Sequence, residues 1–236
     1  MRMRVGLRLD VVFEPAPEGR CAHVLASGQR CGAELDAGGH HAAACGRGGA
    51  FHRRHNGVVH ALASELRRMG FNVRREVWLP ELMETLPGGG VREARMDLVI
   101  DGPHGQYLLD ITCFHPFSGK GKRRTHGAGG TLEAQEAMKR ARYPVRDAAR
   151  RRRTLASFHP IVVSTFGDVG PAAQLLFRSF EATAIESREA FSRHKHGWLT
   201  NLVSYAAAIG SATAIAAAYT APDGQMRAHY RGAAHS

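Results

Sequence analysis

Two acidic residues, Asp97 and Asp110, lie in β-prone runs on either side of the turn sequence Gly-Pro-His-Gly. We expect the runs, residues 95–101 and 106–114, to pair as an antiparallel hairpin whose paired residue numbers sum to 207. The two acids then lie opposite each other on one face, with Cβ atoms about 5 Å apart, and their like charges need a balancing cation. Two carboxylates with open positions are a common way to hold Mg²⁺ against a phosphate.

Alternation along the hairpin predicts one apolar face and one polar face. Thr112 shares the polar face with the two acids. Lys139 is one of only four lysines and belongs to the next predicted helix, from which its ammonium reaches back over the sheet to a scissile phosphate. The alternative is two edge-strand aspartates and a solvated lysine. The residues expected on the apolar face are Met96, Leu98, Ile100, Leu109 and Ile111.

The first fifty residues contain a second group with ligand chemistry, made of three thiols and an imidazole. Such a set suits a structural, tetrahedral Zn²⁺ site. Nine residues separate the first two cysteines, which is wide for a zinc pair. His23 is therefore an alternative ligand and His40 competes with His41, while unbound cysteines and surface histidines are the reading without a metal. The proposed ligands are Cys21, Cys31, His41 and Cys45.

The chain has 236 residues, a formal net charge of +11 and a sequence pI near 10.2. Most of the excess lies in residues 116–153, which contain twelve basic and three acidic residues. Such a concentration is typical of a face that binds a polyanion, and nucleic acid is the expected partner. The alternative is a solvated, arginine-rich helix surface. The basic residues assigned to nucleic-acid contacts are Lys120, Lys122, Arg123, Arg124, Arg140 and Arg142.

Hydrophobic periodicity over residues 52–195 predicts the order helix, strand, strand, strand, helix, strand, helix. The first helix is capped by Asn56 and ends at Gly70, and a loop runs from Pro80 to Gly90. A second helix starts near Thr131 and reaches at least Tyr143. The fold class is therefore α/β (α+β). The predicted parts are a zinc-knuckle-like unit (1–50), a core (51–170), a helical extension (171–220) and a frayed tail (221–236).

The cysteine pattern does not resemble a secreted disulfide framework, and the first residues lack the apolar core of a secretory signal. The apolar stretch 202–218 contains polar residues and is short for a membrane span, so we predict a packed helix. These features predict an intracellular protein with no membrane partner.

The quoted residues together resemble the PD-(D/E)XK nuclease superfamily, with its αβββαβ core. More narrowly, residues 20–166 resemble the restriction-like endonuclease module with a zinc knuckle at the carboxy terminus of early-branching non-LTR retrotransposon polyproteins. The matching pieces are Cys-Gly, Gly-His-His-Ala-Ala-Ala-Cys, Arg54-His55-Asn56, Gly70, Glu76, Met96-Asp97-Leu98-Val99, Leu109-Asp110-Ile111-Thr112 and Lys139-Arg-Ala-Arg-Tyr143. Met96 stands where the family usually has proline, and the first cysteine pair is wider than in the family.

The resemblance implies a restriction-endonuclease-like core with a zinc-binding unit before it and helices after it. It implies that Asp97 and Asp110 bind catalytic Mg²⁺ or Mn²⁺, that Lys139 is a displaced catalytic lysine, and that Tyr143 lies nearby. Related nucleases nick DNA so that a reverse transcriptase, in cis or in trans, primes on the freed end. The implied partners are thus DNA, with RNA as a further nucleic acid, and the implied location is the nucleus if the source is eukaryotic.

Four further residues are candidates for accessory roles, namely Arg54, His55, Glu76 and Thr112. His55 either orients a backbone phosphate or supports the helix beneath the zinc unit. The leading functional hypothesis is a metal-dependent DNA endonuclease. The competing hypotheses are a catalytically degenerate nucleic-acid-binding module of the same fold and a zinc-stabilised interaction domain.

Overall fold

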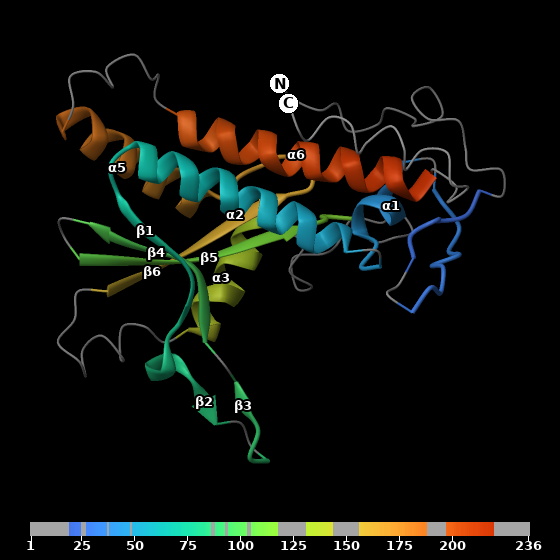
Figure 1. The fold of residues 1–236 in the computed structure, drawn as a ribbon, viewed down its shortest axis with the longest axis horizontal. Coiled ribbons are helices and arrows are strands. Elements are labelled where there is room, and N and C mark those ends of the chain that lie inside the picture. The colour runs from blue at the N-terminus through green and yellow to red at the C-terminus, as the bar shows by residue number, and fades with distance from the viewer. Residues whose placement is uncertain are drawn as a thin grey trace.

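The computed structural model of the protein describes residues 19–24, 27–36, 38–47, 49–85, 88–92, 94–102, 105–117, 131–143, 156–187 and 197–219. Over these residues the fold is mixed α/β, with a four-stranded mixed sheet and five α-helices (Figure 1). The helices are α1 (His40–Ala44), α2 (Ala50–Arg68), α3 (Leu132–Arg142), α5 (Pro171–Ser187) and α6 (Trp198–Tyr219). The sheet strands are β1 (Asn72–Trp78), β4 (Arg95–Gly102), β5 (Gly105–Phe114) and β6 (Ala156–Ser164).

The strand order in the sheet is β1-β4-β5-β6. β4 pairs antiparallel with both β1 and β5, whereas β6 joins β5 in parallel. The β4–β5 register runs from Gly102 opposite Gly105 to Leu98 opposite Leu109, with the predicted sum of 207. The ladder ends there, so the predicted pairing of Asp97 with Asp110 was wrong. The parallel β6 requires a crossover connection, and that connection contains α3.

The order predicted for residues 52–195 is the order observed for α2, β1, β4, β5, α3, β6 and α5. The segment predicted as a loop contains more structure than expected. It holds a short 3₁₀ helix, Pro80–Leu82, and a two-stranded pair, β2 (Glu84–Thr85) with β3 (Val91–Arg92). This pair projects away from the sheet (Figure 1).

Helix α2 begins seven residues earlier than predicted, at Ala50 rather than after Asn56. Its first turns bury Ala50 and Arg54, and neither residue type extends a hydrophobic pattern read from the sequence. The predicted end is correct. Gly70 has φ 95°, and the N–H of Phe71 donates to the Leu66 carbonyl at 3.0 Å, a closure that the left-handed conformation permits.

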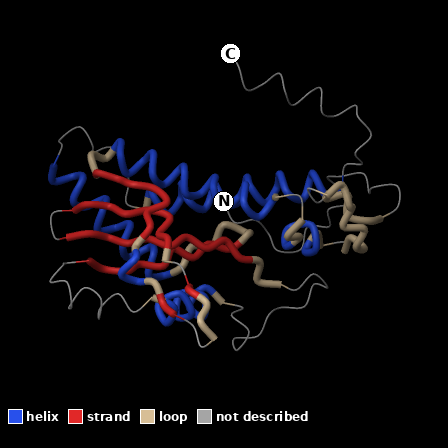
Figure 2. Tube along the Cα trace, turned by 60° about the horizontal axis from the view of Figure 1, so that its bottom comes forward, coloured by secondary structure: helices blue, strands red, loops and turns tan. Residues whose placement is uncertain are grey.

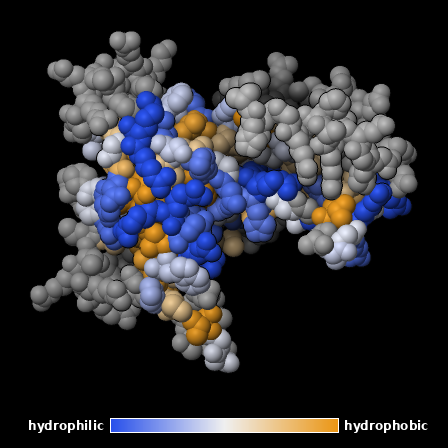
Figure 3. All heavy atoms as spheres, viewed as in Figure 1, coloured by the Kyte–Doolittle hydropathy of each residue, from blue (hydrophilic) through white to orange (hydrophobic). Residues whose placement is uncertain are grey.

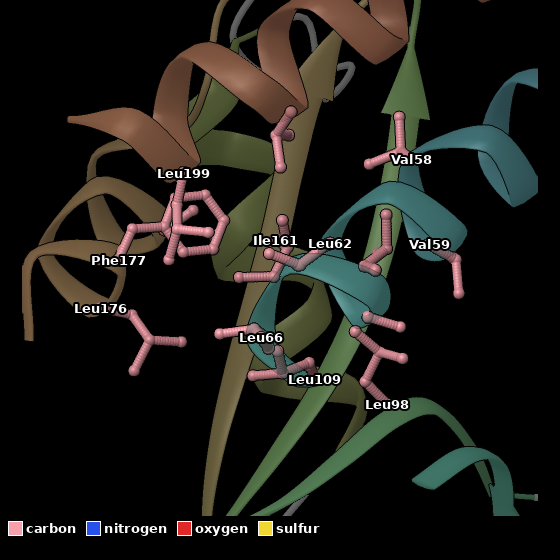
Figure 4. Packing of buried hydrophobic residues seen from close by; sticks show 14 of the residues in the cluster. Val58, Val59, Leu62, Leu66, Leu98, Leu109, Ile161, Leu176, Phe177 and Leu199 are labelled. Atoms are coloured by element: carbon pink, nitrogen blue, oxygen red, sulfur yellow. The ribbon is translucent and has the colours of Figure 1, made fainter. Parts of the chain in front are cut away.

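The principal core lies between the sheet and the layer formed by α2, α5 and α6 (Figure 4). Figure 1 shows α2 and α6 side by side across this face. In the turned view of Figure 2, helices lie above and below the strands. The largest fully buried side chains here are Val58, Val59, Leu62, Leu66, Leu98, Ile100, Leu109, Ile161, Phe177, Phe180 and Leu199.

A second, smaller core lies on the other face of the sheet, near α3. It contains Leu82, Ala94, Met96, Val99, Leu108 and Tyr143. Met96 was predicted on the face of Leu98 and Ile100, and this prediction was wrong. Before Leu98, β4 is not paired to β5, and its pairing with β1 is interrupted opposite Glu76, whose φ is 54°, so the regular alternation of the hairpin does not extend to Met96.

Helix α6 is long and apolar enough to cross a membrane by length and composition, and 28% of its apolar stretch is buried inside the protein. Its first half contributes Leu199, Val203 and Ala207 to the principal core, as the predicted packed helix would. Two buried carboxylates hold its beginning. Glu181 accepts the backbone N–H groups of Gly197 and Leu199, each at 2.8 Å, and Trp198 Nε1 donates to Glu65 Oε1 at 2.9 Å.

We predict that Glu181→Ala lowers the free energy of unfolding by about 1–3 kcal/mol, because two buried N–H groups lose their acceptor. Urea unfolding followed by circular dichroism measures the change. Glu133→Ala, at an exposed acid of α3, is the control and is expected to change stability by about 0.5 kcal/mol or less. Equal stability of the two variants would contradict the anchoring role of Glu181.

Candidate functional site

The wide spacing between Cys21 and Cys31 is bridged by a small hairpin. Arg20 pairs with Glu34 and Val24 with Arg30. The N–H of Cys21 donates to Ala33 O at 2.8 Å, and the N–H of Cys31 donates to His23 O at 2.7 Å. Antiparallel pairing therefore brings the two cysteines together although nine residues separate them.

The other two ligand candidates, His41 and Cys45, come from α1 and the residue that follows it. Asp36 fixes the start of this helix, since its Oδ1 accepts His40 N at 2.9 Å and its Oδ2 accepts His41 N at 2.7 Å. Burial alone would raise the pKa of Asp36, but these backbone donors and the nearby His40 charge lower it below its ordinary value. Asp36 thus orients His41 through its backbone.

The four candidate ligand atoms form one compact group, all within 4.8 Å of one another. Cys45 Sγ lies 3.9 Å from Cys21 Sγ and 3.8 Å from Cys31 Sγ, and His41 Nε2 lies 3.4 Å from Cys31 Sγ. A tetrahedral centre with Zn–S bonds of about 2.3 Å requires sulfur–sulfur edges of about 3.8 Å. The ligand set and its spacing therefore fit a tetrahedral metal.

A hydrogen bond between two of these cysteines favours the thiolate form of one of them. The hydrogen bond between Cys21 and Cys45 raises the pKa of Cys21 and lowers the pKa of Cys45. The fourth cysteine, Cys113, belongs to the principal core, where burial raises its pKa to about 11. His23, the alternative ligand considered from the sequence, instead lies 3.1 Å from the Ala214 carbonyl through its Nε2.

The carboxylate site lies where the central sheet divides. The ladder between β4 and β5 ends at Leu98 and Leu109, although β4 stays paired with β1 and β5 with β6. Asp97 lies in this fork. Its Oδ2 accepts the backbone N–H of Ile111 at 2.5 Å, and its Oδ1 is 3.2 Å from His55 Nε2.

Asp110, the second acid, lies one residue beyond the last pair on β5 and is buried. Lys139 Nζ, from α3, is 2.6 Å from its Oδ2. Burial raises the pKa of Asp110, the Lys139 charge opposes that effect, and the nearby Asp97 charge adds to it, so the pKa lies above its ordinary value. The fork is therefore acidic and largely buried, and α3 supplies it with one ammonium, that of Lys139.

His55 connects α2 to the fork. Burial lowers its pKa, but the hydrogen bond to Asp97 and the charges of Asp97, Asp110 and Glu76 outweigh burial and raise it. Glu76 lies on β1 with φ 54°, a left-handed conformation that is strained for a residue with a side chain. Its Oε2 is 2.5 Å from Arg95 Nη2.

The remaining predicted site residues lie around this group. Tyr143 is buried in the second core with its ring 5.1 Å from that of Phe158. Thr112 is half-buried on β5, and Arg140 and Arg142 are exposed on α3. Several basic residues of the segment 116–153 lie outside the described residues, as does the predicted frayed tail. They are Lys120, Lys122, Arg123, Arg124 and the arginine run 150–153.

Several residues that join the metal-ligand group to the rest of the fold were not predicted. His40 Nδ1 is 3.2 Å from His115 Nε2, and His115 Nδ1 is 2.6 Å from Thr165 Oγ1. Ala22 N donates to Ala218 O at 2.9 Å. Glu65 of α2 is also buried, and it accepts the Trp198 indole N–H. These contacts join segments far apart in the chain, so no local sequence pattern predicts them.

Comparison with models of known protein families gives no match for this chain, and comparison with curated proteins gives no relative. The geometry of the two sites and the resemblance of the motifs are therefore the grounds for assigning a function.

We predict that Asp110→Asn raises the free energy of unfolding at pH 7 in buffer without divalent cations. The raised pKa means that the native environment disfavours the charge of Asp110, and the amide removes that charge. As the pH falls through the native pKa towards the ordinary value of about 3.9, the native wild type takes up a proton and the difference narrows. Urea unfolding between pH 4 and pH 7 measures this difference in the free energy of unfolding between the variant and the wild type.

Asp101→Asn, at a more exposed acid of β4 that pairs with Arg74, is the control and is expected to lose a little stability. If Asp110→Asn instead unfolds more easily than the wild type throughout this range, the ion pair with Lys139 outweighs the burial of the carboxylate.

Proposed function

We propose that this protein is a metal-dependent DNA endonuclease with a restriction-endonuclease-like αβββαβ core. The observation that carries the proposal is the juxtaposition of Asp97, Asp110 and Lys139 at the fork between β4 and β5. Two acids from neighbouring strands and a lysine from the following helix are the set expected for phosphodiester hydrolysis. The element order and the motifs described above add the resemblance to PD-(D/E)XK nucleases.

The donor set of the fork fits Mg²⁺ or Mn²⁺. Asp97 and Asp110 offer hard oxygen ligands, and ions of this kind keep several waters when two carboxylates bind them. Burial, together with the smaller effect of the Asp97 charge, raises the pKa of Asp110 despite Lys139, so a bound cation would stabilise its carboxylate. When bound, the ion would supply Lewis-acid stabilisation of the phosphate and a more acidic water.

The side chains around the acids have distinct tasks in this proposal. Lys139 leaves Asp110 to contact a non-bridging phosphate oxygen or the attacking water, where its charge counts most in a poorly hydrated site. His55 holds the Asp97 carboxylate from the α2 side. Water attacks phosphorus, the bond to one ester oxygen breaks, and the released oxygen takes up a proton. The strain at Glu76 keeps a third acid beside His55.

DNA is the proposed substrate because the basic excess follows the acids directly in the chain and continues on the exposed side of α3 with Arg140 and Arg142. The resemblance extends the proposal to target nicking for a reverse transcriptase in cis or in trans, to contacts with RNA, and to a nuclear location in a eukaryote. Tyr143 would support the Lys139 turn of α3 from the second core.

We further propose that the group of Cys21, Cys31, His41 and Cys45 binds a structural Zn²⁺. All four positions of a tetrahedral ion are filled by protein, as in structural sites. The small core around these four ligands contains few apolar side chains, among them Leu35, Ala42 and Ala218. Such a small core needs a metal to be stable.

The nuclease proposal predicts nicking of supercoiled plasmid with Mg²⁺ or Mn²⁺. We expect Lys139→Met to reduce the rate at saturating DNA by about 100-fold or more, because transition-state charge loses a preorganised cation. Asp97→Asn and Asp110→Asn are expected to reduce it at least as much. Arg178→Met removes the same charge from an exposed position on α5 and serves as the control with full activity.

Equal nicking by the wild type and Asp110→Asn would refute the catalytic assignment. A wild type that retains DNA with strong salt dependence and never cuts it would favour the catalytically degenerate binding module. Absence of salt-sensitive retention would favour an interaction domain.

The zinc proposal predicts one zinc per purified chain by elemental analysis. We expect Cys45→Ser to lose the metal and to lower the midpoint of thermal unfolding, since metal binding contributes to folding. Cys113→Ser is the matched control, because Cys113 lies outside the cluster, and it is expected to keep one zinc. Loss of zinc from both variants, or from neither, would show that the cluster is not the binding site.

A further inference from the structure

Arg54 is a buried charge without an acidic partner in the described part of the chain. It is 2% exposed, and its Nε has no hydrogen-bond acceptor there. Burial lowers the pKa of Arg54, and the Cys113 thiol opposes this effect. Guanidinium groups stay charged in proteins, and buried charges are ordinarily paired because burial without compensation is costly. The position therefore calls for a source of negative charge.

The guanidinium points to such a source. Arg54 Nη1 donates to the Ala43 carbonyl at 3.1 Å, and Ala43 belongs to α1, between His41 and Cys45. A zinc ion held by three thiolates and one imidazole carries one net negative charge, whereas protonated thiols carry none. Bound zinc would thus place one negative charge on the cluster whose helix accepts the Arg54 guanidinium at Ala43.

The side chain is held in place from the opposite direction by α6. A Cβ atom on Gly210 would lie 2.9 Å from Cα, Cβ and Cγ of Arg54, so only glycine permits this approach. Figure 3 shows that the exposed side of α2 is hydrophilic. Arg53 is exposed, whereas Arg54 is buried. Two consecutive arginines of one helix therefore differ in burial and contacts.

The residue after Arg54 reaches the other site, since His55 Nε2 lies 3.2 Å from Asp97 Oδ1. We propose that Arg54 is a positioning residue shared by the two sites: it compensates the charge of the zinc cluster through α1 and fixes the α2 turn that sets His55 against Asp97. The inference rests on the proposed zinc site and nuclease, and it adds that both depend on one side chain that is neither a ligand nor in contact with substrate.

The first measurement is zinc affinity, by competition with a chromogenic chelator. We expect Arg54→Met to bind zinc about 10- to 100-fold more weakly than the wild type, as outer-sphere substitutions commonly do. Arg54→Lys keeps the charge but loses the fork of donors, and is expected to lie between the two. Arg53→Met and Arg53→Lys are the matched controls and keep wild-type affinity.

The second measurement is plasmid nicking at saturating zinc. Arg54→Met is expected to lower kcat by about 10-fold or more through misplacement of His55 and Asp97, with the KM for DNA unchanged. A loss of binding alone would raise KM instead. Methionine is tolerated at many buried charged positions. If Arg54→Met fails to fold by circular dichroism, the comparison of Arg54→Lys with Arg53→Lys decides.

The outcomes separate the inference from the proposals beneath it. A wild type that binds no zinc refutes the zinc site itself, and a wild type that never nicks refutes the nuclease. A wild type that binds zinc and nicks, with Arg54 variants equal to their Arg53 controls in zinc affinity and kcat, overturns the role of Arg54 alone.

Discussion

Asp110 and Lys139 form an ion pair in a place with little water, one residue beyond the point where β5 leaves β4. The fork leaves Asp97 without a strand partner on the β5 side, and its carboxylate takes the Ile111 N–H instead. Each acid is therefore held by a group that ordinary strand pairing would not supply. The opening of the sheet creates a site that is acidic and largely buried.

Both faces of the sheet must be packed correctly for this arrangement to form. The principal core holds α2 in place and thereby His55, whereas the second core, with Tyr143, holds the end of α3 and thereby Lys139. His55 and Lys139 reach the fork from opposite layers. A shift of either helix would leave an acid underbalanced, so the cores determine the electrostatics of the site as well as the stability of the fold.

The hairpin register was predictable because a turn signal and a period of two define it locally, and Thr131 was recognisable because its side chain caps α3. The ligand set was predictable from residue type alone. The start of α2 was not, because its inner face uses an arginine and small residues. The face of the sheet on which Met96 lies depends on the fork, and the contacts of His55 depend on helix packing. Both are long-range features. The hairpin that closes the cysteine gap is also irregular, with isolated bridges rather than a continuous ladder.

Helix α6 imposes an order on assembly during synthesis. The cysteine-containing unit leaves the ribosome among the first parts of the described chain, but the carbonyls of Ala214 and Ala218 that receive His23 and Ala22 leave among the last. The two contacts that dock the unit on α6 therefore form only after the sheet and its helices have been made. Early capture of metal would protect these thiols during that interval, so the timing of metal delivery bears on the yield of correctly assembled protein.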